Sequence, residues 1–528
     1  MMKQRNFQMK QASPAPSGNK MGTMPLGRLL LSMALPLAIS MLVQALYNVV
    51  DSIYISKISE SAVTALSLAF PVQNLMIGFA TGIGVGMNSL FSKSLGEGKQ
   101  DKANRCAGNG ILLMCGAVLL FVVFGAVGAA PYYTMQSSVA ETVASGTDYV
   151  SICCLFSLGI FVEILFERLL QASGRAVYSM ITQATGAVIN IVLDPVFIFG
   201  WFGFPAMGVA GAAVATVLGQ WVAAGLAIFF NLRFNPDVQF SRHVFRPDGA
   251  LIRPIIGVGV PSIIMMAIGS VMNFSMNQIL QGFSETATGV FGIYFKLQSF
   301  FFMPVFGVNN AAISILAFNY GARQPDRITG TLKRSCCAAM GIMLAGVLTF
   351  QLIPDVLLGF FNPSAHFLHM GRSALRIISI HFPLAAVGIA LGAAFPALGN
   401  GIYSTITSLC RQLVVLVPVA WLLSLSGEVN AVWWAFPVAE VISLIGKGEK
   451  KENIAFAVVD SIVKKVASQA SRLEKGGPVC LTGGLCESDY IRQALGEQLH
   501  TQVQAVAEGR YAGAVGAALC ARDLMKKG

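Results

Sequence analysis

Three polar residues inside otherwise apolar stretches are the first candidates for chemistry. Asp51 lies in "YNVVDSIYIS", and Asn190 and Asp194 lie in "NIVLDPVFIFG". Asn190 and Asp194 are four residues apart, so they project from one face of a helix. Pro195 has no N–H and can free a backbone carbonyl beside them. Such a set can carry a proton or enclose Na⁺ with oxygen atoms. The alternative is an aspartate that caps a helix near the end of the apolar segment.

Other ionisable residues in apolar stretches are candidates for a ligand cavity. Lys296, in "FGIYFKLQSFFFMPVFGVNN", is predicted either to face a cavity or to pair with a carboxylate. Glu163 and Glu167 share a helix face; Glu163 is placed to bind a cationic ligand, and Glu167 is expected at the membrane interface beside Arg168. The candidate cavity set is completed by Gln298, Met303 and Asn273. His381 is expected to be a core residue and Arg411 a structural partner.

The composition indicates a membrane protein. The chain has 528 residues, 55% hydrophobic and 12% charged, with a mean hydropathy of +0.67. A soluble chain of this length could not hide so much apolar surface. The net charge of +11 is assigned to loops between apolar runs, and no nucleic-acid partner is expected. The ten cysteines contain no Cys-x-x-Cys pair, so neither a zinc site nor a disulfide framework is indicated.

The elements that must position these residues are membrane-spanning helices. The sequence predicts an all-α polytopic fold with twelve spans, near residues 29–56, 62–92, 106–130, 147–168, 176–200, 208–231, 250–280, 287–319, 331–354, 373–396, 403–425 and 430–445. Basic residues gather in every second loop, with only Lys57 and Arg372 in the others. The loops rich in Lys and Arg are therefore predicted to be cytoplasmic, and the N-terminus with them.

The chain matches itself at an offset of 225 residues. Gly82 maps onto Gly307 and Gly96 onto Gly321, and "YSMIT" (178–182) answers "YSTIT" (403–407). Six helices separate equivalent points, so the two halves are predicted to be parallel six-helix repeats.

The repeat also exposes a break near the end of the last helix. At an offset of 223, the apolar residues 223–230 should recur at 446–453, which instead are "GKGEKKEN". The twelfth helix is therefore predicted to be truncated and followed by a small α/β segment, with strands in "PVCLTGG" and "TQVQAVA".

Two resemblances follow from these motifs. Residues 20 to about 445 resemble the multidrug and toxic compound extrusion family through "LPLAISMLVQALYNVVDSIYI", "NIVLDPVFIFG", "GVAGAAVATVLGQ" and "KLQSFFFMPVFG". This implies two six-helix lobes and efflux of cationic, amphipathic compounds against inward H⁺ or Na⁺. The family's N-lobe cation site falls on Asp51, Asn190 and Asp194, with Thr216 as a fourth member. The tail resembles acyl-CoA dehydratase activases, ATPases of the actin and Hsp70 superfamily, through "GKGEKKENIA", "LTGGLCESDYIRQALGEQL" and "YAGAVGAALCARD".

These observations give a set of expectations. The predicted parts are a disordered cytoplasmic tail (1–28), an N-lobe (29–235), a cytoplasmic linker (236–249), a C-lobe (250–445) and a partial activase-like segment (446–528). We expect a monomeric antiporter in a bacterial inner membrane, with both termini cytoplasmic, in contact with lipids and small cationic or amphipathic substrates. No cofactor and no metal other than Na⁺ is expected. No enzymatic activity is expected, because the phosphate loop of the activases is missing. The alternatives are a lipid-linked precursor flippase and a non-functional chimera.

Overall fold

The computed structural model describes residues 19–359, 361, 365–446, 479–481 and 503–505. Contacts divide the chain into two compact units, Met1–Ser443 and Leu444–Gly528.

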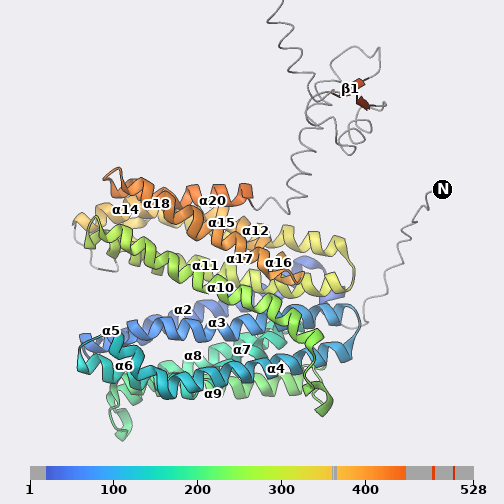
Figure 1. Ribbon diagram of the computed structural model, residues 1–528, viewed down its shortest axis with the longest axis horizontal. Coiled ribbons are helices and arrows are strands. Elements are labelled where there is room, and N and C mark those ends of the chain that lie inside the picture. Colours follow the sequence, from blue (N-terminus) through green and yellow to red (C-terminus); the bar gives the residue numbers. More distant parts are fainter. Residues whose placement is uncertain (1–18, 360, 362–364, 447–478, 482–502, 506–528) are drawn as a thin grey trace, which may run out of the picture. The chain divides into compact units, whose positions relative to one another are not determined.

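The first half of the larger unit forms the N-lobe, which is coloured blue to green in Figure 1. A one-turn helix, α1, precedes it. The elements are α1 (Lys20–Thr23), α2 (Leu26–Ser56), α3 (Glu60–Gly96), α4 (Gln100–Val123), η1 (Phe124–Gly128), α5 (Ala129–Gln136), α6 (Ala140–Leu155), α7 (Leu158–Ala172), α8 (Ala176–Phe199), η2 (Trp201–Gly203) and α9 (Gly208–Phe234).

The second half forms the C-lobe and is joined to the first through η3 (Arg242–Phe245). Its elements are α10 (Gly249–Gln281), α11 (Glu285–Gly321), α12 (Pro325–Leu352), α13 (Pro354–Gly359), α14 (Ala365–Ser379), α15 (Phe382–Gly392), α16 (Ala394–Ala397), α17 (Gly401–Leu409), η4 (Cys410–Leu416), α18 (Val417–Ser424), α19 (Val429–Trp433) and α20 (Ala435–Gly446).

The apolar helices confirm the predicted all-α membrane fold. Among the described residues, nine helical segments are long and apolar enough to cross a membrane. Two bent pairs, Ala140–Leu155 with Leu158–Ala172 and Ala365–Ser379 with Phe382–Ala397, supply the fourth and tenth spans. The shorter Val429–Ser443 takes the place of the twelfth. These segments follow the predicted order one for one.

The smaller unit contains two described strands, β1 (Val479–Leu481) and β2 (Val503–Ala505). They pair in parallel, with Val479 opposite Val503. Both lie inside the segments predicted as strands. The rest of the predicted α/β segment lies outside the described residues.

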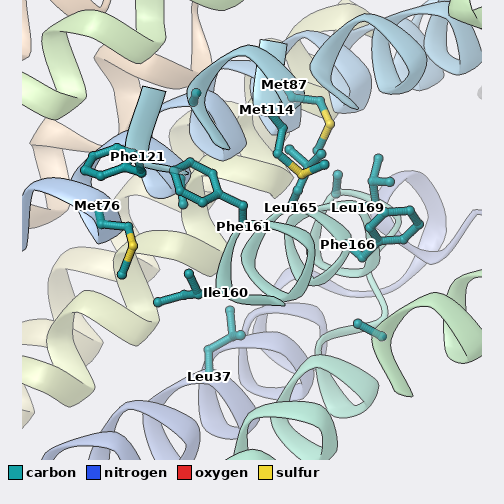
Figure 2. Packing of buried hydrophobic residues seen from close by; sticks show 14 of the residues in the cluster. Leu37, Met76, Met87, Met114, Phe121, Ile160, Phe161, Leu165, Phe166 and Leu169 are labelled. Carbon is teal, nitrogen blue, oxygen red and sulfur yellow. The ribbon is translucent and has the colours of Figure 1, made fainter. Parts of the chain in front are cut away.

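The core of the N-lobe is built on one face of α7. Phe161, Leu165 and Leu169 recur every four residues and are buried. They pack toward side chains of α3 and α4, among them Met87 and Met114 (Figure 2). The opposite face of α7 carries Glu163 and Glu167, so this helix separates an apolar core from a polar interior.

The two lobes touch through glycines that the repeat relates to each other. A Cβ atom at Gly96 would collide with the Phe318 carbonyl oxygen, and one at Gly321 with the Lys93 carbonyl oxygen. Adding 225 maps Lys93 onto Phe318 and Gly96 onto Gly321. Each of these two contacts is therefore the repeat counterpart of the other. The same offset relates the contact of Gly82 with Ile263 to the contact of Gly307 with Ala38. The interface between the lobes is therefore pseudo-twofold, as expected for two parallel repeats.

These contacts gather toward one end of the helices, which we call the basic end because the Lys- and Arg-rich loops lie there. From the pair at Gly96 and Gly321, they extend along α3 and α10 to Gly78 and Met266, near the middle of both helices. Figure 1 shows α10 and α11 converging on α2 and α3 toward one end and diverging toward the other. The diverging end, which contains the C-terminal ends of α2 and α8, is called the neutral end.

Candidate cation site and substrate cavity

A cavity of about 160 Å³ lies inside the N-lobe. Helices α2, α3, α7, α8 and α9 supply most of its wall. The lining residues include two carboxylates and no Lys, Arg or His: Gln44, Tyr47, Phe70, Gln73, Asn74, Met76, Ile77, Cys153, Ile160, Glu163, Ile164, Glu167, Gln183, Gly186, Ala187, Asn190, Thr216 and Gln220.

The spacing of the lining residues explains how the helices form this wall. On α8, Gln183, Ala187 and Asn190 lie on one face, and Asp194 continues it one turn later. On α9, Thr216 and Gln220 are four residues apart. Each helix therefore directs one stripe inward while its other residues meet the core or the surface.

Asn190 is the centre of the predicted cation site. Its Nδ2 donates to Asp194 Oδ1 at 3.3 Å and to Thr216 Oγ1 at 3.2 Å. Asn190 is 3% exposed and Asp194 is fully buried. The fold thus brings three of the four predicted residues into hydrogen-bonding contact across α8 and α9.

Asp51 joins this group from α2. Asp51 lies within electrostatic range of Asp194. Tyr47, one turn before Asp51, lies within electrostatic range of Asp51, Asp194 and Glu163. Tyr47 therefore links the predicted cation site to the cavity wall.

Several oxygen atoms in this region have no hydrogen-bond partner among the described residues: Asp51 Oδ1, Glu167 Oε1, Asn190 Oδ1 and Asp194 Oδ2. None of the ion pairs between described side chains involves Asp51, Glu163, Glu167 or Asp194. A buried charge without a partner costs several kcal/mol. These carboxylates are therefore suited to take up a proton or to bind a cation with their free oxygens.

The donor groups of this region are mixed in kind and are not all charged. In the described part of the chain, no group of three His, Cys, Asp or Glu side chains is placed to hold a metal ion. The unpartnered oxygens come instead from a mixture of carboxylate and amide groups. Carboxylates can take up a proton, and carboxylate and amide oxygens together can bind a hard cation.

The structure separates the residues predicted to line a substrate cavity. Glu163 lines the N-lobe cavity, whereas Lys296, Gln298, Met303 and Asn273 lie on α10 and α11 of the C-lobe. Gln298 accepts a hydrogen bond from Tyr294 Oη at 2.5 Å. Lys296 is exposed and lies eleven residues, about three helical turns, from Gly307, which contacts Ala38 of the N-lobe. Lys296 thus lies on the side of α11 that carries the contact with the N-lobe, toward the neutral end.

Glu167 differs from its predicted position. Instead of lying at an interface beside Arg168, it is 7% exposed and lines the cavity. The guanidinium of Arg168 donates to Gln171 at 3.0 Å. The reason is the helical spacing: Glu167 follows Glu163 by one turn and shares its inward face, while Arg168 points 100° away.

The C-lobe places its buried charge in a different way. Arg411 Nη1 lies 2.6 Å from Glu440 Oε1, and Glu440 is 6% exposed. The aromatic ring of Phe436, one turn before Glu440, lies 5.7 Å from that of His381. The predicted structural role of Arg411 is thus matched by a partner on the twelfth helix, and His381 lies in the core as expected.

Several polar cavity residues did not figure in the sequence predictions, among them Gln44, Tyr47, Gln73 and Gln183. Gln44, Tyr47 and Asp51 are spaced by three and four residues in an apolar run, which is a signal that the sequence contains. Gln183 lies seven residues before Asn190 on the same face of α8. Gln73, which donates to Tyr149 Oη at 2.9 Å, has no such local signal, because its partner is on another helix.

One match to a known protein family spans both lobes and shows the family to which the chain belongs. The model of the MatE family matches residues 36–196 and 261–422. The chain belongs to the MatE family. The two matched segments begin 225 residues apart, at the offset of the repeat. A second model, that of the BadF/BadG/BcrA/BcrD ATPase family, matches residues 424–521. The resemblance of the tail to that family is thereby confirmed.

Curated relatives share the MatE unit at low identity. The chain is 23% identical over 417 residues to the multidrug export protein MepA of Staphylococcus haemolyticus, covering 78% of this chain and 89% of that protein. It is 24% identical over 430 residues to an FAD transporter of Shewanella oneidensis, covering 79% and 92%. A solved multidrug resistance MATE family transporter, described as outward-facing, superposes with a TM-score of 0.78 at 23% identity, covering 86% of this chain and all of that one.

Proposed function

We propose that the MatE unit, residues 20 to 445, exports cationic amphipathic compounds by antiport against H⁺ or Na⁺. The observation that carries this proposal is the group of buried and half-buried carboxylates at or next to the N-lobe cavity, which form no ion pair with a described side chain. The name of the relative MepA, a multidrug export protein, supports the substrate class. An acidic cavity attracts a cation and disfavours an anion of similar size.

The proposed coupling depends on competition for these carboxylates. A cationic substrate and the coupling ion each neutralise Asp51, Asp194 or Glu163, so binding one weakens binding of the other. Such reciprocal binding is what exchange of substrate for ion requires. The lobes contact each other at the basic end, so access alternates when that contact opens and the neutral ends close.

The orientation of the unit follows from its loop charges. We place the basic end in the cytoplasm and the neutral end outside, in a bacterial inner membrane. The conformation described above is then open to the outside. With this orientation the N-terminus and the smaller unit are both cytoplasmic.

The tail is proposed to have no enzymatic role. The match of the ATPase family model covers 98 residues and begins after the last MatE residue. Hydrolysis needs groups that hold the nucleotide phosphates, and the activase phosphate loop is missing from the sequence. The test is ATP turnover by the purified full chain. Hydrolysis above that of a chain ending at residue 445 would overturn this part of the proposal.

A second substrate class has one observation in its favour. The FAD transporter is as similar to this chain as the multidrug exporter, and FAD is an anion. Lys296 is an exposed cation on the side of α11 that contacts the N-lobe. If the substrate is anionic, Lys296→Ala removes transport and Glu163→Gln spares it. If it is cationic, as proposed, Glu163→Gln removes transport and Lys296→Ala spares it.

The direct test is accumulation of fluorescent cations in cells that lack their own efflux pumps. Cells with the full chain, or with residues 1 to 445 alone, are expected to accumulate less dye than cells with Asp51→Asn. Equal accumulation in all three at equal expression would contradict the proposed efflux.

A further inference from the structure

The segment that precedes the first spanning helix, residues 19–24, is held between the two lobes at the basic end. Its turn α1 is capped by Asn19, whose Oδ1 accepts from the Met21 N–H at 3.0 Å. Met21 is fully buried and belongs to the hydrophobic core. A segment that places its apolar side chain in the core is part of the packed structure.

Contacts with the C-lobe are made through backbone carbonyls of this segment. Arg327 Nη2 donates to the Met21 carbonyl at 2.8 Å and to the Met24 carbonyl at 2.9 Å. Its Nε donates to Asn319 Oδ1 at 3.0 Å, and Asn319 Nδ2 donates to the Met21 carbonyl at 3.3 Å. Hydrogen bonds from a charged donor are stronger than neutral ones.

Contacts with the N-lobe side are made through side chains. Asn19 Nδ2 donates to Asp237 Oδ2 at 3.4 Å, in the segment after α9. Lys20 packs against Gly174, between α7 and α8, so closely that a Cβ atom there would lie 3.0 Å from Lys20 Cε. Asp237 also lies 4.0 Å from Arg175 Nη2. The segment thus bridges the end of the N-lobe bundle and the junction of α11 with α12.

We propose that residues 19–24 are a latch that stabilises the conformation closed at the basic end. When the lobes separate there, Arg327 moves away from Gly174 and Asp237. Residues 19–24 cannot keep both sets of partners, so opening breaks the contacts on one side and exposes Met21. The closed state is therefore favoured by these contacts, and weakening them shifts the population toward the opposite state. This inference rests on the proposed alternation of the lobes, but not on the substrate or the coupling ion.

The second crossing between the lobes gives a contrast. Asp248, just before α10, pairs with Arg105 of α4 at 2.7 Å, and Asn109 of α4 donates to the Arg246 carbonyl at 3.2 Å. That segment is the covalent link between the lobes and stays between them in every state. The latch differs because its contacts with the C-lobe are non-covalent.

The test measures the separation of the lobes without using transport. Spin labels are placed at Asp101 of α4 and Thr329 of α12, both exposed at the basic end, in a cysteine-free background. The distribution of label distances is recorded for the otherwise unchanged chain and for Arg327→Ala. The latch predicts that the ratio of long to short distances rises about tenfold in Arg327→Ala, as expected for loss of charge-assisted hydrogen bonds.

Arg334→Ala is the matched control. Arg334 is a second arginine on α12, but it is exposed and its described hydrogen bond goes to the Gly330 carbonyl of its own helix, at 3.2 Å. It should leave the distribution unchanged. Met21→Ser changes a residue outside the spanning helices of both lobes; it should shift the distances as Arg327→Ala does, and it replaces that variant if Arg327→Ala does not fold. Unchanged distances in the folded variants would overturn the latch. A shift without any substrate transport would keep the latch and reject the proposed function.

Discussion

In the N-lobe, buried and half-buried carboxylates line a cavity or lie next to it and form no ion pair with a described side chain, whereas in the C-lobe Glu440 is held by Arg411 at 2.6 Å. The repeat makes this difference informative. Asp51 corresponds to Met276 and Asp194 to Val419, and at the offset of 223 Thr216 corresponds to Ala439. The lobes therefore share the helices and the glycine contacts but not the charges. Among the described residues of the spanning helices, the unpaired carboxylates near the cavity belong to the N-lobe, whereas Glu440 of the C-lobe is paired with Arg411.

The largest change in stability is expected when the C-lobe pair is broken. Arg411→Ala leaves Glu440 buried without its partner, which should lower the free energy of unfolding by about 3–5 kcal/mol. The double variant Arg411→Met, Glu440→Leu should recover most of this loss. Thermal unfolding in detergent measures both.

The exposed pair Arg372–Asp355, at 2.8 Å, is the control for that experiment. Arg372→Ala should cost at most about 1 kcal/mol, because water screens both charges. If Arg411→Ala were as harmless as Arg372→Ala, Glu440 would be as free as the N-lobe carboxylates and the contrast between the lobes would fail.

A similar loss is expected from the twelfth helix, which lies beyond the residues matched by the MatE model and within those matched by the ATPase family model. Trp433 is fully buried, with its ring 6.5 Å from that of Phe291. Trp433→Ala should cost about 3–5 kcal/mol, whereas Trp434→Ala, at a position 46% exposed, should cost much less. Unfolding midpoints that fall equally in the two variants would indicate that this segment is not part of the C-lobe core.

An intermediate effect is expected at the pseudo-twofold interface. Gly96→Val and Gly321→Val each force a side chain against a carbonyl of the other lobe, at a cost of about 1–3 kcal/mol to the closed basic end. Drug efflux should fall in both to a similar degree. Gly116→Val, where a Cβ atom meets nothing within 4 Å, is the control. Loss of efflux in only one of the two interface variants would show that the lobes do not use these contacts equivalently.

The smallest effect is expected at Thr216. Thr216→Val keeps the shape but removes the acceptor for Asn190 Nδ2, which is worth about 0.5–1.5 kcal/mol. The ion concentration for half-maximal efflux should shift about twofold to tenfold. In Thr185→Val it should stay unchanged, because that hydroxyl donates to the Ile181 carbonyl of its own helix. Complete loss of coupling in Thr216→Val would make Thr216 a direct ion ligand.

Much of this contrast could be predicted from the sequence. Asn190 and Asp194 share a helix face by spacing, and the repeat showed that their C-lobe counterparts are apolar. The partner of Arg411 could not be predicted, because Glu440 lies on a different helix and pairing between helices is a tertiary property. The inward position of Glu167 was missed for a related reason: its neighbour Arg168 suggested a surface, while the helical face that it shares with Glu163 determined its burial.

The most direct test of the central claim compares ion-driven efflux in proteoliposomes containing the full chain or its Asp194→Asn variant. Both are first assayed for substrate exchange without an ion gradient, which should occur in each because the lobes still alternate. A gradient of H⁺ or Na⁺ should then drive the full chain to accumulate substrate against a concentration difference. The same gradient should drive no such accumulation by the Asp194→Asn variant. Gradient-driven accumulation of equal size in the two proteins would contradict the assignment of coupling to the free carboxylates of the N-lobe.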